Sequence, residues 1–306
     1  MVLEYIYVVR HGYRMNWVVN PATGEYNSSF PTPTGIASDP TLAAYGVKQA
    51  EQLGAHLHTV QPPVDLIYSS PWYRCLQTLQ PFVTTLADKR KIQPAAYPGL
   101  VQINLETGLG EFFGRARFDH PSPAPVEELK DLFPNLHAEE FNIVPSTNGE
   151  TIPGLHDRVA YALNELVKRA DADPNGPKTL LICSHAAIMI CIGRILTGRM
   201  PEDECEDDFK CYTCAFSRYS RRSPQTKAIE VQRWSSSNPE SIPDVSWRGG
   251  AGVAGGWNCE VNGDCSFLSG GEERGWRFSG DESFLKDPNA FNDAANTSTP
   301  KDNAKL

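Results

Sequence analysis

The sequence predicts an α/β protein in which helices cover a mostly parallel sheet. Two runs, residues 5–9 and 178–183, have the length and the β-branched or aromatic content of buried strands. A third run of this kind lies at residues 65–70. Helix-like stretches separate the three runs, and strands that alternate with helices are typical of parallel sheets.

The other elements follow from the same kinds of pattern. Apolar residues at helical spacing predict helices over residues 42–60, 155–170 and 186–196. Pro71 begins a further helix, at the first-turn position that proline favours. We expect more strands within residues 92–101, 212–219 and 228–234. The polar loop at residues 16–40 is long for a connection inside a domain, and we expect it to cover the strand ends.

The C-terminal quarter of the chain differs in composition from the rest. We predict a catalytic domain over residues 1–234, a linker at 235–256, a small β-rich extension at 257–285 and a disordered tail at 286–306. Serine, proline and glycine are frequent in the linker, and Asn262-Gly263 is a hairpin turn signal. We expect the extension to serve partner binding more than catalysis.

Composition excludes several classes of protein. The 306 residues carry a net charge of −9, which argues against direct nucleic-acid binding. No apolar run is long enough for a membrane span, and no secretory signal pattern precedes the first strand. We therefore expect a location in the nucleus, the cytoplasm or both. Cys211 and Cys214 lack a second pair with metal-ligand spacing, so we expect reduced thiols and no bound metal.

Two of the predicted strands end in histidine. Arg10-His11-Gly12 follows the first strand, and Ser184-His185 follows the strand at residues 178–183. In open α/β sheets, ligands bind at the carboxyl ends of the strands. We therefore expect His11 and His185 to meet at one edge of the sheet.

Charged residues elsewhere complete a candidate phosphate site without a metal. Arg74 enters from the helix that begins at Pro71, and Glu111 enters from a glycine-rich loop. A neutral imidazole can attack phosphorus, and arginines can bind the oxygens of the transferring group. A carboxylic acid can give the leaving alkoxide its proton. Arg14 either extends this pocket or pairs with a surface acid.

These residues resemble the motifs of the histidine phosphatase (phosphoglycerate mutase-like) superfamily over residues 5–234. The matching motifs are Arg10-His11-Gly12, Ser69-Ser70-Pro71 with Arg74, Gly110-Glu111 and Ser184-His185. The resemblance implies a three-layer α/β/α sandwich and a phosphatase that needs no cofactor. It further implies His11 as the nucleophile, Glu111 as the proton donor, and Arg10, Arg74 and His185 as the groups that hold the phosphate.

Longer stretches resemble one fungal group within this superfamily, a subunit of RNA polymerase III transcription factor IIIC. They lie at residues 6–17, 70–76, 184–187 and 262–273. The resemblance implies other subunits of that factor as partners. It leaves two functions open, an active phosphatase on a phosphorylated small molecule or phosphoprotein, and a catalytically weak scaffold for protein interaction.

Overall fold

The computed structural model describes residues 2–93, 101–138, 141–174, 176–223, 231–280 and 282–285. Its central sheet has seven strands in the order β6-β5-β4-β7-β1-β8-β9. The strands are β1 (Tyr5–Arg10), β4 (Leu66–Ser69), β5 (Ile103–Leu105), β6 (Leu136–His137), β7 (Thr179–Ser184), β8 (Phe216–Arg221) and β9 (Trp257–Asp264). A separate hairpin joins β2 (Trp17–Asn20) and β3 (Glu25–Ser28).

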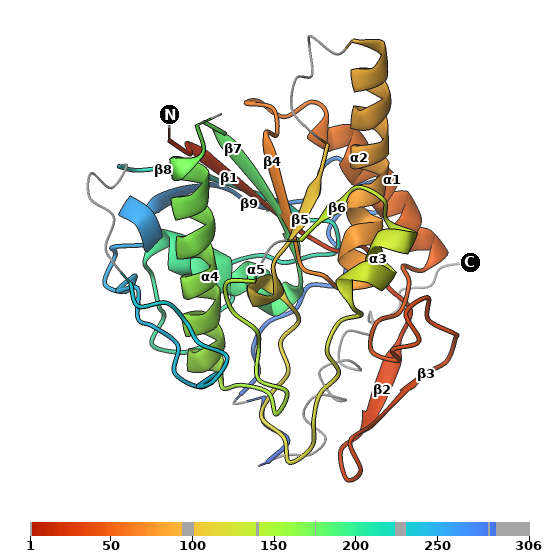
Figure 1. The fold of residues 1–306 in the computed structure, drawn as a ribbon, viewed down its shortest axis with the longest axis vertical. Coiled ribbons are helices and arrows are strands. Elements are labelled where there is room, and N and C mark those ends of the chain that lie inside the picture. The colour runs from red at the N-terminus through yellow and green to blue at the C-terminus, as the bar shows by residue number, and fades with distance from the viewer. Residues whose placement is uncertain are drawn as a thin grey trace, which may run out of the picture.

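Helices cover both faces of the sheet (Figure 1). They are α1 (Ala44–Leu57), α2 (Tyr73–Ile92), α3 (Val126–Leu132), α4 (Ile152–Ala172) and α5 (Ala186–Thr197), with short 3-10 turns η1 (Thr107–Leu109) and η2 (Val253–Gly255). In Figure 1, α4 and α5 lie on one side of the sheet, and α1 and α2 lie on the other. Within the described ranges, no helix combines the length and the apolar character that a membrane crossing needs.

The centre of the sheet is parallel, as predicted. β1 pairs in parallel with β7, β7 with β4, and β4 with β5, whereas β8 is antiparallel to β1. All six residues of β7 are buried, which explains why its centre, residues 180–183, is a continuous apolar run. The register pairs Arg10 with Ser184, so the two strands end side by side. The predicted meeting place of His11 and His185 follows from this register.

Three predicted strands differ from the structure. α2 continues to Ile92, where Lys89, Arg90 and Lys91 favour the carboxyl end of a helix, and the next strand begins only at Ile103. β8 begins at Phe216 because Cys214 has a left-handed backbone, with φ 55°, that interrupts the extended chain before it. Of the strand expected at 228–234, residues 231–234 are not a strand, and the rest lies outside the described residues.

β9 takes the sheet position beside β8. The prediction of a hairpin turn at Asn262-Gly263 is wrong, because both residues lie inside β9. The register advances by two residues from Phe216 to Arg218 but by three from Asp264 to Val261. Gly263, with φ +71°, provides the left-handed residue for this bulge. Asn-Gly therefore adds one residue to the strand and does not reverse it.

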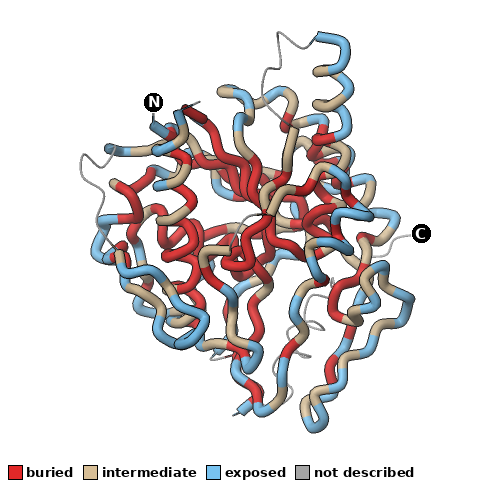
Figure 2. The backbone as a smooth tube through the Cα atoms, viewed as in Figure 1, coloured by how far each residue is buried: buried red, intermediate tan, exposed pale blue. Residues whose placement is uncertain are grey.

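The segment predicted as a linker packs into the main core. Val245, Trp247 and Val253 are buried in the same apolar cluster as the central strands. Trp247 stacks on His156 of α4, and Arg248 forms an ion pair with Asp157 at 2.8 Å. Figure 2 shows buried backbone concentrated along the sheet and the inner helix faces. The described residues end at residue 285, so the predicted tail at 286–306 lies outside them.

Truncation of Trp247 tests whether residues 235–256 belong to the folded core. We expect Trp247→Ala to lower the free energy of unfolding by about 3–5 kcal/mol, because the indole is fully buried. Urea unfolding, followed by far-UV circular dichroism, measures this. The control Ile92→Ala changes a side chain that is 78% exposed and should alter stability by less than about 0.5 kcal/mol. Equal unfolding midpoints for the two variants would mean that the segment acts as a linker.

Candidate active site

His11 lies directly after β1 and is buried. Its Nδ1 donates to the carbonyl oxygen of Gly12 at 2.8 Å, so the lone pair of the neutral ring is on Nε2. The Gly12 amide in turn donates to Thr78 Oγ1 at 3.0 Å. A Cβ on Gly12 would lie only 2.8 Å from the carbonyl oxygen of Gly46, so this turn requires glycine. These contacts fix the orientation of the His11 ring.

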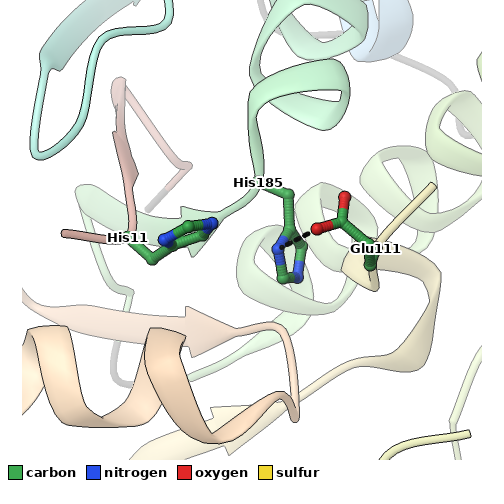
Figure 3. Close-up of side chains that lie close together, drawn as sticks. All are labelled: His11, Glu111 and His185. Atoms are coloured by element: carbon green, nitrogen blue, oxygen red, sulfur yellow. Dashed lines mark ion pairs between the residues drawn. The ribbon is translucent and has the colours of Figure 1, made fainter. Parts of the chain in front are cut away.

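His185 lies opposite His11, at the start of α5 (Figure 3). The two ring centroids are 5.3 Å apart. The Nε2 atom of His185 is 2.8 Å from Ser70 Oγ, and its Nδ1 atom is 3.2 Å from Glu111 Oε2. The dashed line in Figure 3 marks this contact with Glu111. The structure therefore brings together His11, Glu111 and His185, three of the residues that the sequence analysis placed in the site.

Arg74 holds Glu111 from the other side. Its guanidinium is fully buried and donates to Glu111 Oε2 at 2.9 Å. It also donates to the Ser38 carbonyl oxygen at 3.1 Å and to Asp39 Oδ1 at 3.3 Å. One carboxylate oxygen of Glu111 thus lies between Arg74 and His185, two groups expected to hold phosphate.

Asp39 is a supporting residue that sequence reasoning missed. Besides holding Arg74, its carboxylate accepts from the backbone amide of Tyr73 at 2.9 Å, in the first turn of α2. Burial raises the pKa of Asp39 to about 6, although Arg74 acts in the opposite direction. Nothing near Asp39 in the sequence marks it, because Tyr73 and Arg74, which link it to the site, lie about 35 positions later.

Arg10 and Arg14 line the cavity above His11. Arg10 Nη1 donates to the carbonyl oxygens of Cys211 at 2.7 Å and Arg274 at 2.5 Å. Arg14 donates to the carbonyl oxygen of Met15 at 3.0 Å and lies over the Trp17 ring. Of the two readings left open for Arg14, the geometry supports the pocket, and among the described residues no surface acid pairs with it.

The cavity has a volume of about 170 Å³. His11, Glu111 and the two arginines line it. Residues of the predicted extension form part of the remaining wall: Arg274, Gly275, Trp276 and Glu282. We expected this extension to serve partner binding more than catalysis, and the structure places part of it at the cavity. Its sequence contains no motif that reveals this long-range contact.

Burial and neighbouring charges adjust the pKa values of the central groups. Burial lowers the pKa of His11 well below its ordinary value, and the positive charges of Arg74 and Arg10 lower it further. Burial would raise the pKa of Glu111, but His185 and Arg74 outweigh it and hold that pKa well below its usual range. Burial would lower the pKa of His185, yet Cys75 and Glu111 raise it above its ordinary value. These pKa directions favour a neutral His11 beside an ionised Glu111.

The same residues offer the donor set of a metal site. Ligand atoms of His11, Glu111 and His185 lie within 4.8 Å of one another, and no other group of this kind occurs in the described part of the chain. However, the guanidinium of Arg74 already donates to the Glu111 oxygen, and a positive charge there repels a cation. The surroundings suit an anion better than a divalent ion.

Comparison with known proteins gives the family. The model of the histidine phosphatase superfamily (branch 1) matches residues 6–234, and the chain belongs to this superfamily. The expected fold is confirmed by the ecdysone phosphate phosphatase of Bombix mori, solved with tungstate. That structure aligns with a TM-score of 0.51 at 18% identity, over 76% of this chain and 98% of its own.

Two curated proteins are similar in sequence. The chain is 29% identical to the transcription factor tau 55 kDa subunit of Saccharomyces cerevisiae over 286 residues, which are 91% of this chain and 59% of that protein. It is 24% identical to the ecdysteroid-phosphate phosphatase of Drosophila melanogaster over 224 residues, which are 66% of this chain and 28% of that one. The chain therefore spans less than two thirds of either relative.

The pKa directions predict how phosphatase turnover depends on pH. Because the nucleophile must be neutral, the acid limb of kcat/KM should lie well below pH 6.5, the ordinary histidine pKa. At alkaline pH, kcat/KM should fall as His185 loses its proton through its raised pKa. A profile between about pH 4 and pH 9, corrected for the substrate's own ionisation near pH 6, measures both limbs. An acid limb at the ordinary histidine pKa would contradict the assignment of His11.

Proposed function

We propose that this protein is a metal-independent phosphomonoesterase that acts through a phosphohistidine on His11. The observation that carries the proposal is the geometry of His11, a buried imidazole whose Nδ1 donates to the Gly12 carbonyl oxygen, so that Nε2 carries the lone pair beside His185. The lowered pKa of His11, caused by burial and by Arg74, agrees with a neutral ring. Arginine and histidine donors stabilise the charge on a transferring phosphoryl group. Membership of the superfamily supports this assignment.

The position of Glu111 supports its role as the proton donor. Its carboxylate lies between Arg74 and His185, where a phosphoryl oxygen would bind. An incoming phosphate would take over these partners and place negative charge beside Glu111. Both effects raise the pKa of Glu111, so that the group gains a proton as substrate binds.

The reaction then has two steps. In the first, His11 Nε2 forms a bond to phosphorus, the ester P–O bond breaks, and the leaving oxygen takes a proton from Glu111. In the second, water gives a proton to Glu111 and attacks phosphorus, which releases phosphate and restores His11. Arg10, Arg74 and His185 hold the phosphoryl oxygens throughout, and the substrate is a phosphorylated small molecule or phosphoprotein.

A second function, as an interaction subunit, is favoured by the similarity to the tau 55 kDa subunit, which extends over 91% of this chain. On this proposal the partners are subunits of transcription factor IIIC, the location is the nucleus, and contact with nucleic acid is indirect because the chain carries a net charge of −9. Capture of those subunits by a wild-type protein without turnover would favour the scaffold role over catalysis.

Substitution of His11 tests the covalent mechanism. We expect His11→Ala to abolish hydrolysis of an aryl phosphate, because no other described imidazole lining the cavity can attack phosphorus. Labelled substrate should leave acid-labile, base-stable phosphate on the wild type but none on the variant. The control His58→Ala changes a histidine outside the cavity and should keep turnover near the wild-type rate. Full activity in His11→Ala would remove it as the nucleophile.

A chelator tests the absence of a catalytic metal. We expect turnover of the purified protein to stay unchanged in excess EDTA, because arginines rather than a cation meet the phosphate charge. Steady-state rates before and after dialysis measure this. Loss of activity that a divalent ion restores would mean that His11, Glu111 and His185 bind a metal instead.

A further inference from the structure

We propose that Arg274 selects phosphomonoesters that carry a second anionic group next to the phosphoryl group. This inference rests on the proposed phosphatase function and assigns part of the substrate specificity to the C-terminal segment. Arg274 lies outside residues 6–234, which the family model matches, but it lines the same cavity as His11.

The arginines of this cavity lack the acidic partners that other arginines in the protein have. Arg158, Arg194 and Arg221 each form an ion pair with a carboxylate. In contrast, no carboxylate of the described residues lies within ion-pair distance of Arg10, Arg14 or Arg274. In a chain with a net charge of −9, this leaves positive charge concentrated in one cavity.

The backbone of Arg274 is fixed relative to the phosphate site. Its carbonyl oxygen accepts from Arg10 Nη1 at 2.5 Å. Its φ of 56° lies in the left-handed region, which glycine adopts more easily than arginine. The adjacent Gly275 is packed against the Tyr212 ring, since a Cβ there would lie 3.0 Å from Tyr212 Cε1. Arginine occupies a position where glycine would be less strained, which points to a use for its side chain.

The side chain lies at the cavity and is exposed to solvent. Its guanidinium lies over the Tyr13 ring, 4.3 Å from the centroid, and this contact directs it without neutralising its charge. Glu282, the carboxylate on the same wall, accepts from the amide of Ser279 at 2.7 Å and forms no ion pair with Arg274. Arg274 therefore presents a directed positive charge to the part of a substrate that extends beyond the phosphate.

The matching substrate carries a carboxylate or a second phosphate near the ester. An acidic phosphopeptide and a small phosphorylated acid both have this chemistry. Deeper in the site, Arg74, Arg10 and His185 are occupied by the transferring phosphoryl group. Arg274 would thus discriminate between substrates by the charge of the leaving group.

Paired substrates test the proposal. One pair is phenyl phosphate and 4-carboxyphenyl phosphate, and the other is a phosphopeptide flanked by alanine and the same peptide flanked by glutamate. We measure kcat/KM for both members in wild type, Arg274→Gln, Arg274→Lys and Arg277→Gln. For each variant we take the ratio of kcat/KM for the anionic member to kcat/KM for the neutral member and compare it with the wild-type ratio. Differences in leaving-group reactivity are the same for every variant and therefore cancel.

We expect the preference for the anionic member to fall roughly fivefold in Arg274→Gln, the size of an exposed ion pair. Arg274→Lys should recover part of it, and high salt should reduce it in the wild type. Arg277→Gln changes an exposed arginine of the same segment outside the cavity and should leave the ratio and the rate unchanged. If Arg274→Gln lowers the preference in only one pair, that pair identifies the substrate as a phosphopeptide or a small molecule.

An unchanged ratio in both pairs for Arg274→Gln overturns the proposal. If no substrate is hydrolysed, the proposed phosphatase function fails, and binding then decides the role of Arg274. Calorimetry with phenylphosphonate and 4-carboxyphenylphosphonate gives the same ratio without turnover. A preference for the carboxylated phosphonate that Arg274→Gln removes would support the proposal, and equal affinities would reject it.

Discussion

The fully buried guanidinium of Arg74 requires acceptors and negative charge around it, and distant parts of the chain meet this need. A buried charge without partners would be strongly destabilising. The Ser38 carbonyl and the Asp39 carboxylate come from the loop before α1, whereas Glu111 comes from the loop after η1. The loops on either side of the pocket are thereby tied to the first turn of α2.

On the proposed mechanism, Glu111 would have two states. It is the anion that satisfies Arg74 and His185, and it would give up both partners and become an acid when substrate binds. Exchange of one anion for another would keep the buried positive charge compensated at every stage. The same exchange would couple the protonation of Glu111 to occupancy of the site, so that the proton is available when the leaving oxygen needs it.

The sequence contained enough to place the centre of the site but not its surroundings. Strand-end motifs located His11 and His185 because the register of β1 and β7 is set by their apolar runs. Asp39 and Arg274 escaped notice because their roles depend on contacts with residues far away in the sequence. Asn262-Gly263 misled because the same dipeptide suits both a hairpin turn and a bulge, and only the pairing with β8 decides between them.

The place of β1 in the sheet also affects how the chain is made. β1 lies between β7 and β8, and its register pairs Tyr5 with Thr179 and Ser220. A ribosome therefore synthesises more than half of the chain before either neighbour of this apolar strand exists. Pairings of such sequence separation form slowly, and an unpaired apolar strand is prone to aggregate in the meantime. Chaperones that shield nascent chains would thus find a binding segment in the strand that directly precedes His11.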